Sequence, residues 1–252
     1  MHRFATALLA TAAVVGISMS ASAADLPRKA PAYVPPAPLP YNWTGFYVGL
    51  NAGGSWGRQT NSLESAITGA TLFSNSNHID GFIGGGQIGY NWQVNQWVFG
   101  LEADFQGSAQ KGDGTFFLPG TTGVNILVVP STSIAYEDKL NWFGTVRGRL
   151  GWAFDRWMPY VTGGFAFGHG EINGTATTGA VVTAFSNSHD YSGWTVGGGV
   201  EWAFYNNWSA KLEYLYINFG DGPTVPVGTT FLGASGKLTD NIVRVGVNYK
   251  FF

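Results

Sequence analysis

The chain has 252 residues, no cysteine and a formal net charge of −2, with 15% aromatic but only 11% charged residues. The lack of cysteine excludes disulfides, catalytic thiolates and zinc ribbons, and the small net charge offers no basic field to attract nucleic acid. The many aromatic residues argue against disorder, and the charged fraction is about half that of an ordinary soluble surface. This composition suits one β domain whose outer surface faces lipid.

The first 23 residues have the pattern of a secretory signal peptide. His2 and Arg3 precede an apolar run that ends at Ile17, and Ala21-Ser22-Ala23 has the small-x-small form of a cleavage site. The run is shorter than the ~20 residues that a membrane-spanning helix needs. We therefore expect residues 1–23 to be removed on export; the alternative is an uncleaved anchor helix.

Residues 24–41 are rich in proline and show neither a strand nor a helix period. Such a composition predicts an extended periplasmic linker. From Trp43 onward apolar residues recur at every second position, so we assign residues 42–252 to a single β domain.

Eight segments of this domain alternate for at least the ~9–11 residues with which a tilted strand crosses a bilayer. In the segment that begins at Pro159 the parity is ambiguous, and we take Val161, Phe165 and Phe167 as outward. The segments are Trp43–Gly57, Ile79–Gln93, Gln96–Gly107, Asp138–Phe154, Pro159–Glu171, Tyr191–Phe204, Trp208–Phe219 and Leu238–Phe251.

The connections between these segments alternate in length. Bacterial outer-membrane barrels have short periplasmic turns and long external loops, so the pattern predicts an all-β, eight-stranded antiparallel up-and-down transmembrane β-barrel. Short connections lie near Val94-Asn95, at Asp155-Arg156-Trp157 and at Tyr205-Asn206-Asn207; long ones are Arg58–His78, Ser108–Glu137, Ile172–Asp190 and Gly220–Lys237.

Two tryptophans bracket each short connection. An indole ring prefers hydrocarbon while its N–H prefers water, so tryptophan collects at the membrane interface. These residues predict the periplasmic half of an aromatic girdle; the alternative is a plug at the bottom of a soluble barrel. The pairs are Trp92 and Trp97, Trp152 and Trp157, and Trp202 and Trp208.

The charged residues within the strands share the polar face, and acidic and basic groups balance. Facing lipid near the midplane, each Arg or Lys would cost ~2–4 kcal/mol, so we expect all of them in the lumen. Because eight strands enclose an interior that side chains fill, we expect ion pairs and no open pore. The residues are Glu102, Asp104, Arg147, Arg149, Glu201, Lys211, Glu213 and Arg244, and the expected pairs are Glu201–Lys211, Glu102–Arg149 and Asp104–Arg147.

The glycine series Gly84-x-Gly86-x-x-Gly89 has the letters of a dinucleotide-binding fingerprint. That fingerprint needs a helix after it, whereas this series lies inside an alternating strand. We therefore expect the glycines to make room for bulky lumen neighbours or to ease barrel curvature.

The histidines offer weak sites, so we expect no cofactor, no metal and no enzymatic activity. His78 and His189 lie where long loops meet strands, and a metal or haem there is less expected than a solvated rim. His169 with Ser186 or Ser188 is the one set from which a catalytic base and nucleophile can be assembled. The apolar segment Asn125–Pro130 either folds over the barrel mouth or contacts a partner.

Several stretches resemble the small outer-membrane immunogenic, porin-family proteins of rhizobia and related α-proteobacteria, over essentially the whole chain. These proteins are eight-stranded barrels similar to the OmpA transmembrane domain. The stretches are the junction ASAADLP, the segment KAPAYVPPAPLPYNWTGFYVGLNAG, the repeated pattern GWAF…W…PYVTGG and the ending VGVNYKF.

The resemblance implies outer-membrane lipids as surroundings and insertion by the barrel assembly machinery, which reads a terminal aromatic strand. Tyr249, Phe251 and Phe252 then form the assembly signal, with Phe251 in phase with the outward residues and Phe252 one residue beyond. Some relatives attach to peptidoglycan through the mature N-terminus, here Ala24 and Asp25. Others bind haemin or host surfaces, and no motif of this chain matches those activities.

We therefore expect a structural outer-membrane barrel that supports envelope integrity and surface interaction. The alternatives are a narrow porin-type channel for small solutes, loop-mediated haem or ligand binding, a rim enzyme and a soluble β-barrel.

Overall fold

The computed structural model describes residues 40–65, 71–118, 120–122, 128–129, 131–220, 224–227 and 231–251. The expected signal peptide, Ala24 and Asp25, nearly all of the expected linker, and Phe252 lie outside these ranges. Within them, no helix has the length and apolar character needed to cross a membrane.

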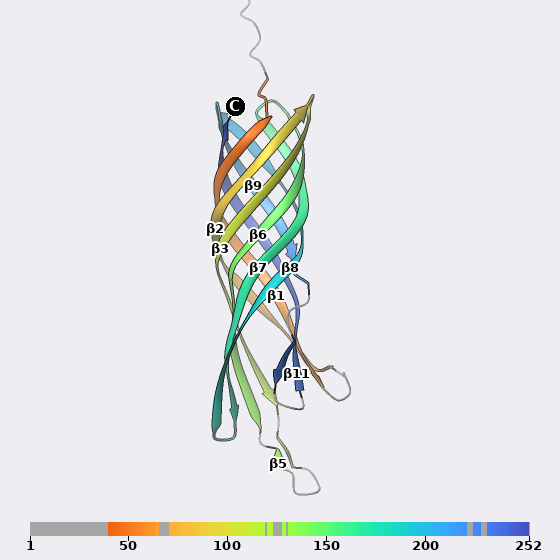
Figure 1. Ribbon diagram of the computed structural model, residues 1–252, viewed down its shortest axis with the longest axis vertical. Coiled ribbons are helices and arrows are strands. Elements are labelled where there is room, and N and C mark those ends of the chain that lie inside the picture. The colour runs from red at the N-terminus through yellow and green to blue at the C-terminus, as the bar shows by residue number, and fades with distance from the viewer. Residues whose placement is uncertain are drawn as a thin grey trace, which may run out of the picture. The chain divides into compact units, whose positions relative to one another are not determined.

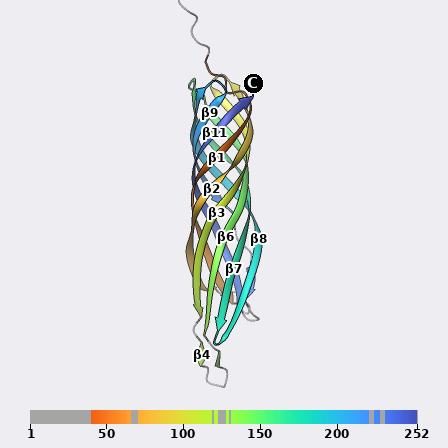
Figure 2. The ribbon, with the colours of Figure 1, turned by 90° about the vertical axis from the view of Figure 1, so that its left-hand side faces the viewer.

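Eight long antiparallel strands follow one another in chain order, and pairing between β1 and β11 closes them into a ring. Figures 1 and 2 show the strands winding steeply around a common axis. The predicted all-β, up-and-down barrel is confirmed. The strands of the ring are β1 (Gly45–Ser65), β2 (Thr71–Val94), β3 (Trp97–Leu118), β6 (Thr132–Trp152), β7 (Trp157–Thr178), β8 (Val181–Tyr205), β9 (Trp208–Asn218) and β11 (Phe231–Phe251).

Three short strands lie outside the ring. β4 (Thr121–Thr122) pairs with β5 (Val128–Val129), and β10 (Thr224–Val227) pairs with Phe231–Ala234 of β11. Two residues of the expected apolar segment therefore form β5; Asn125 to Leu127 and Pro130 lie outside the described residues.

The short turns lie where the sequence predicts them, and we call this end of the barrel the short-turn end. Asn95, Asp155 and Asn206 have φ values of 55°, 54° and 31°. Asn and Asp enter this left-handed region at lower cost than most side chains. Tight turns at these positions let each hairpin close with few residues.

At the opposite end, the long-loop end, the predicted loops are partly wrong. β7 and β8 stay paired from Trp157 and Trp202 to Thr178 and Val181, so the segment expected as the loop Ile172–Asp190 is a continuous hairpin. Parts of the other three predicted loops are also strand in the structure. This part of the hairpin buries neither face well, and without one buried face the strand alternation disappears from the sequence.

The faces of the strands follow the predicted parity with one correction: Leu140, expected outward with Trp142, is buried in the lumen, because the register shifts between Leu140 and Trp142. Leu50, Phe82 and Leu101 point outward and are 74%, 82% and 69% exposed. In β7, Val161 and Phe165 are exposed and Phe167 is half-exposed, as predicted. The outer surface of the barrel is thus a broad apolar band, as a lipid-facing barrel requires.

The glycine series of β2 divides between the two faces. A Cβ at Gly89 would meet the Tyr47 ring and would lie 2.7 Å from the Leu101 carbonyl oxygen. Gly84 and Gly86 pair with the outward residues Ala52 and Leu50, and a Cβ there meets only loose contacts. The expected role in making room for a lumen side chain therefore applies to Gly89 alone.

Candidate functional site

Inside the ring lies a cluster of eight charged side chains, here named the charge network. Strand alternation points all of them to the axis, and each is buried. With four carboxylates and four bases, the network is formally neutral. It comprises Glu102 and Asp104 of β3, Arg147 and Arg149 of β6, Glu201 of β8, Lys211 and Glu213 of β9, and Arg244 of β11.

Arg147 is the centre of the network. Its guanidinium contacts Glu102, lies 2.9 Å from Asp104 Oδ2 and donates to Glu213 Oε1 at 3.0 Å. Arg244 joins the same carboxylates, with Nη2 at 3.0 Å from Asp104 Oδ2 and Nε donating to Glu213 Oε2 at 2.7 Å. Shared carboxylates of this kind compensate buried charge that would otherwise be costly.

A second set of pairs lies nearer the short-turn end. Arg149 contacts Glu102 at 3.3 Å and Glu201 at 2.7 Å, and Lys211 Nζ lies 3.0 Å from Glu102 Oε1. The expected contacts Glu102–Arg149 and Asp104–Arg147 are therefore present. Lys211 lies opposite Glu201 in the register, as expected, but its amine reaches across the lumen to Glu102.

Glu201 is satisfied by other donors. Ser209 Oγ and Asn248 Nδ2 donate to Glu201 Oε1 at 2.6 and 2.8 Å, and Arg149 occupies the other carboxylate oxygen. The expected Glu201–Lys211 ion pair is thus wrong. Lys211 Nζ instead donates to both carboxylate oxygens of Glu102, at 3.0 and 3.1 Å.

Neutral side chains complete the network. Tyr47 and Tyr160 donate to Glu102 and Glu213 at 2.7 and 3.0 Å, and Thr145 donates to Asp104 at 2.7 Å. The guanidinium of Arg149 lies 4.0 Å from the centre of the Tyr160 ring. None of these residues was predicted to belong to the network, although their inward parity was an available signal.

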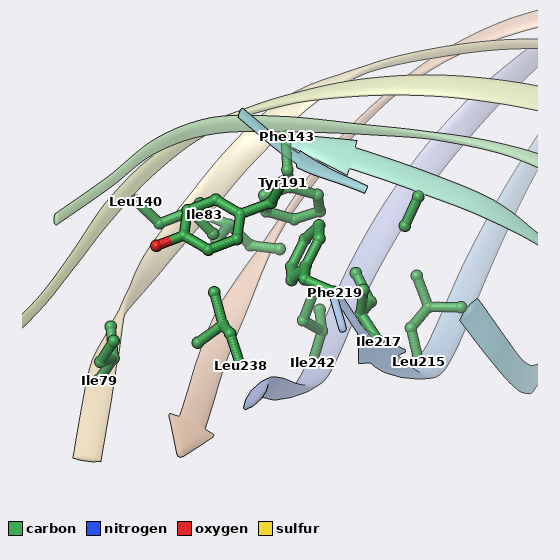
Figure 3. Close-up of a cluster of buried hydrophobic side chains, with 11 residues drawn as sticks. Ile79, Ile83, Leu140, Phe143, Tyr191, Leu215, Ile217, Phe219, Leu238 and Ile242 are labelled. Atoms are coloured by element: carbon green, nitrogen blue, oxygen red, sulfur yellow. The ribbon is translucent and has the colours of Figure 1, made fainter. Parts of the chain in front are cut away.

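An apolar layer fills the lumen next to the network on its long-loop side (Figure 3). On β9, Leu215 and Ile217 follow Glu213, and on β6 Phe143 precedes Arg147; the three apolar side chains are 0% exposed. This layer was not predicted, because the charged residues on the inward face indicate a polar lumen. Its members are Ile79, Ile83, Leu140, Phe143, Ala166, Tyr191, Leu215, Ile217, Phe219, Leu238 and Ile242.

A second apolar group, the plug cluster, closes the short-turn end. Trp43, which precedes β1, lies inside the barrel; its indole N–H donates to the Asp155 carbonyl at 3.1 Å and its backbone N–H to Gln93 Oε1 at 2.7 Å. Burial raises the pKa of the neighbouring Tyr41 phenol to about 12. The cluster comprises Trp43, Val98, Ala153, Met158, Tyr160 and Ala203, with Tyr41 against it.

The six tryptophans at the short turns lie on the outside of the barrel. Trp97 packs edge-on against Trp152 at 4.6 Å between ring centres, and Trp157 stacks on Trp202 at 5.4 Å. Trp92 and Trp208 are also exposed. Their place at a membrane interface stays a prediction, supported by this outward band of rings.

The terminal strand places Tyr249 and Phe251 on the same side, 5.0 Å apart between ring centres, with Phe251 40% exposed. Phe251 pairs with Phe46 of β1 and so takes part in closing the barrel. The reading of these residues as an assembly signal stays a prediction.

The histidines do not assemble a site. His169 Nδ1 lies 2.6 Å from Asp190 Oδ1 and its ring stacks on Trp142, while Ser186 and Ser188 pair with Asn173 and Glu171. His189 packs edge-on against Tyr191 at 5.1 Å, and His78 lies exposed on β2. Among the described residues, no three His, Cys, Asp or Glu side chains are placed to hold a metal.

Comparison with known proteins identifies the family. The family model for the outer membrane protein beta-barrel domain matches residues 9–251. The chain belongs to this family. It is therefore a protein of the outer membrane, as the named relatives also are.

Three relatives show how far the similarity extends. The 31 kDa outer-membrane immunogenic protein of Brucella melitensis is 39% identical over 240 residues, covering 92% of this chain and 94% of its own. The 25 kDa outer-membrane immunogenic protein of Brucella abortus is 27% identical over 259 residues, covering 100% of both chains. The 22 kDa outer membrane protein of Rhizobium leguminosarum is 29% identical over 212 residues, covering 83% of this chain and 79% of its own.

Among solved structures, Neisserial surface protein A matches with a TM-score of 0.40 and 16% identity, covering 82% of this chain and 98% of that chain. The outer membrane protease OmpT of Escherichia coli matches with a TM-score of 0.47 and 11% identity, covering 84% of this chain and 99% of that chain.

Proposed function

We propose that this protein is a closed, non-enzymatic structural barrel of the outer membrane. Its short-turn end faces the periplasm, and its long-loop end supports surface interaction. The observation that carries the proposal is the layered lumen, in which the charge network lies between the apolar layer and the plug cluster. Such an interior strengthens a membrane protein without making a path through it.

The layers oppose permeation in two ways. An ion or solute would have to enter the apolar layer, where Phe143, Leu215 and Ile217 leave no exposed surface and where an aqueous column dewets. It would then have to separate charge-network pairs such as Arg147–Glu213, and stranding a buried charge costs about 3–5 kcal/mol. Both steps favour a barrel that does not conduct.

Other parts of the chain fit the same role. The outward apolar band contacts outer-membrane lipids, with the tryptophans of the short turns at the interface. The barrel assembly machinery would read Tyr249, Phe251 and Phe252, and Ala24 and Asp25 would attach to peptidoglycan at the end of the proline-rich linker of residues 24–41.

Planar-bilayer recording on the purified, refolded protein tests the proposal. We expect no steady conductance above that of the bare bilayer, with an open trimeric porin recorded under the same conditions as the positive control. Steady current steps that change in amplitude in Glu102→Gln and Phe143→Ala variants would instead establish the narrow channel. Glu102 lies in the charge network and Phe143 in the apolar layer. A channel that runs through the whole lumen passes both residues, so both substitutions should change its conductance.

A further inference from the structure

One long strand edge has no partner in the part of the chain that the structure describes. β8 pairs with β7 along its length, up to Val181 opposite Thr178. Its pairing with β9 ends at Trp194 opposite Asn218. The backbone of Val181–Tyr191 therefore has β7 on one side and no described strand on the other. Ser192 and Gly193 lie against Phe219 and Gly220: a Cβ on Gly193 would be 2.7 Å from Phe219 Cα, and one on Gly220 would be 3.6 Å from the Ser192 carbonyl oxygen. Figure 1 shows the β7–β8 hairpin extending beyond the ring at the long-loop end.

The chain after β9 passes Ser192 and Gly193 and forms no further described strand pair with β8. Gly220 has a φ of +73°, and its N–H donates to Asn218 Oδ1 at 3.1 Å, which ends β9. The next described strand, β10, pairs with β11 and not with β8. The strand that follows β9 in the chain therefore extends β11 and does not extend the sheet at β8.

The edge also lacks the features that usually protect an exposed strand. Natural edges carry lysine, proline or a bulge, which discourage pairing with other chains. Val181–Tyr191 contains no Lys, Arg or Pro, and its register with β7 runs without a shift. Val181 and Val182 are 64% and 65% exposed. This edge is a regular template for one more strand.

We propose that the open part of this edge, Val181–Tyr191, binds an extended segment of another protein, which adds a strand to the sheet formed by β3, β6, β7 and β8. Backbone hydrogen bonds would supply most of the affinity. Residues beside Thr183 and Phe185 would be β-branched or aromatic, since such cross-strand pairs are favourable. A basic residue would lie beside Asp190, whose side chain is 85% exposed.

The geometry favours a different protein over a second copy of this chain. A copy in the same membrane would bring its own β8 in the same direction, and parallel pairing is the weaker arrangement. In register, Asp190 of each copy would also face the other, and like charges directly opposite are unfavourable. An extended segment of another protein is free to pair antiparallel and to carry the basic residue. This inference goes beyond the closed lumen and does not depend on it.

The test uses the full-length protein refolded into lipid nanodiscs and a fluorescein-labelled peptide, Arg-Thr-Thr-Val-Thr-Val-Tyr-Val, with binding measured by anisotropy. Two further peptides carry N-methyl groups at alternate residues, one on the odd and one on the even positions. Only one edge of the added strand faces β8, so we expect one methylated peptide to bind like the parent and the other at least about tenfold more weakly.

Protein variants locate the site. Ser186→Lys with Ser188→Lys places two lysines on the β8 edge and should weaken binding about tenfold or more. Asn173→Lys with Thr175→Lys adds the same charge to β7, the interior strand, and should change binding less than about twofold. The proposal is overturned if the parent peptide does not bind, as when a loop of this chain already covers the edge. Equal binding of the two methylated peptides, or equal weakening by the two lysine pairs, also overturns it.

Discussion

At the scale of single residues, the stability of the barrel interior depends on whether each buried charge has its ion-pair partners. Glu102 contacts Arg147, Arg149 and Lys211, and so joins β3 to β6 and β9. Such a group is stable only while its partners are present, because one unpaired ion in a low-dielectric interior is far costlier than a complete pair. The centre of the network should therefore be the most sensitive point of the lumen.

Arg147→Met tests this sensitivity. The substitution leaves Glu102, Asp104 and Glu213 short of one cation, so we expect the free energy of unfolding to fall by about 3–5 kcal/mol. Urea unfolding in lipid vesicles, followed by circular dichroism, measures the change. Arg58→Met is the matched control: Arg58 is exposed on β1, and its loss should change stability by less than about 0.5 kcal/mol. Equal midpoints for the two variants would contradict a paired interior.

The glycines of β2 provide a second residue-scale prediction. In Gly89→Ala the new methyl group meets the Tyr47 ring and the Leu101 carbonyl, so we expect a loss of about 1–3 kcal/mol. Gly84→Ala in the same strand places its methyl on the outward face, where the nearest atom is 3.8 Å away. Its unfolding free energy should stay near that of the parent. A larger loss for Gly84→Ala, measured in the same urea titration, would refute the assignment of faces.

At the scale of elements, the short turns and the long hairpins differ in how visible they are in the sequence. The turn residues Asn95, Asp155 and Asn206 suit positive φ and stand between tryptophans, so the short turns were predicted correctly. The extension of β7 and β8 was predicted as a loop, because Ile172–Asp190 is largely polar and small. Its strand character depends on backbone pairing with a neighbour, which a single segment does not reveal.

The segment before β1 gives the element-scale prediction. Trp43→Ala removes the largest side chain of the plug cluster and its hydrogen bond to Asp155, so we expect a loss of about 3–5 kcal/mol in unfolding free energy. Conductance should stay at the level of the bare bilayer, because the charge network and the apolar layer still fill the lumen. Trp92→Ala is the control, since Trp92 is 59% exposed on the outer face. If the two tryptophans prove equally costly to remove, the plug is not structural.

At the scale of the whole molecule, the barrel separates its charges from solvent. The side chains of Arg147, Lys211 and Glu213 are 0% exposed. Salt screens exposed charges over a Debye length but acts weakly on buried pairs. The layered lumen should therefore behave as a dry interior even though it contains the charge network.

Salt dependence of stability tests this property. Raising NaCl from about 0.1 M to about 1 M should change the urea unfolding free energy by less than about 0.5 kcal/mol, because the mobile ions do not reach the network. Urea is used because guanidinium would itself add salt. A loss of more than about 1 kcal/mol at high salt would show that water and ions enter the lumen, and would favour the channel.

The sequence by itself determined the number and order of the ring strands, the direction of their faces except at the register shift beside Leu140, and the inward position of the eight charges of the network. Each of these properties can be predicted from one strand at a time, because successive side chains of a strand point to opposite faces and the alternation is visible in consecutive residues. The tertiary structure decided that Lys211 reaches Glu102, that Trp43 closes one end, that an apolar layer lies next to the charges and that β8 keeps an unpaired edge. Those features depend on strand tilt and stagger, which bring residues distant in the chain to the same depth of the barrel.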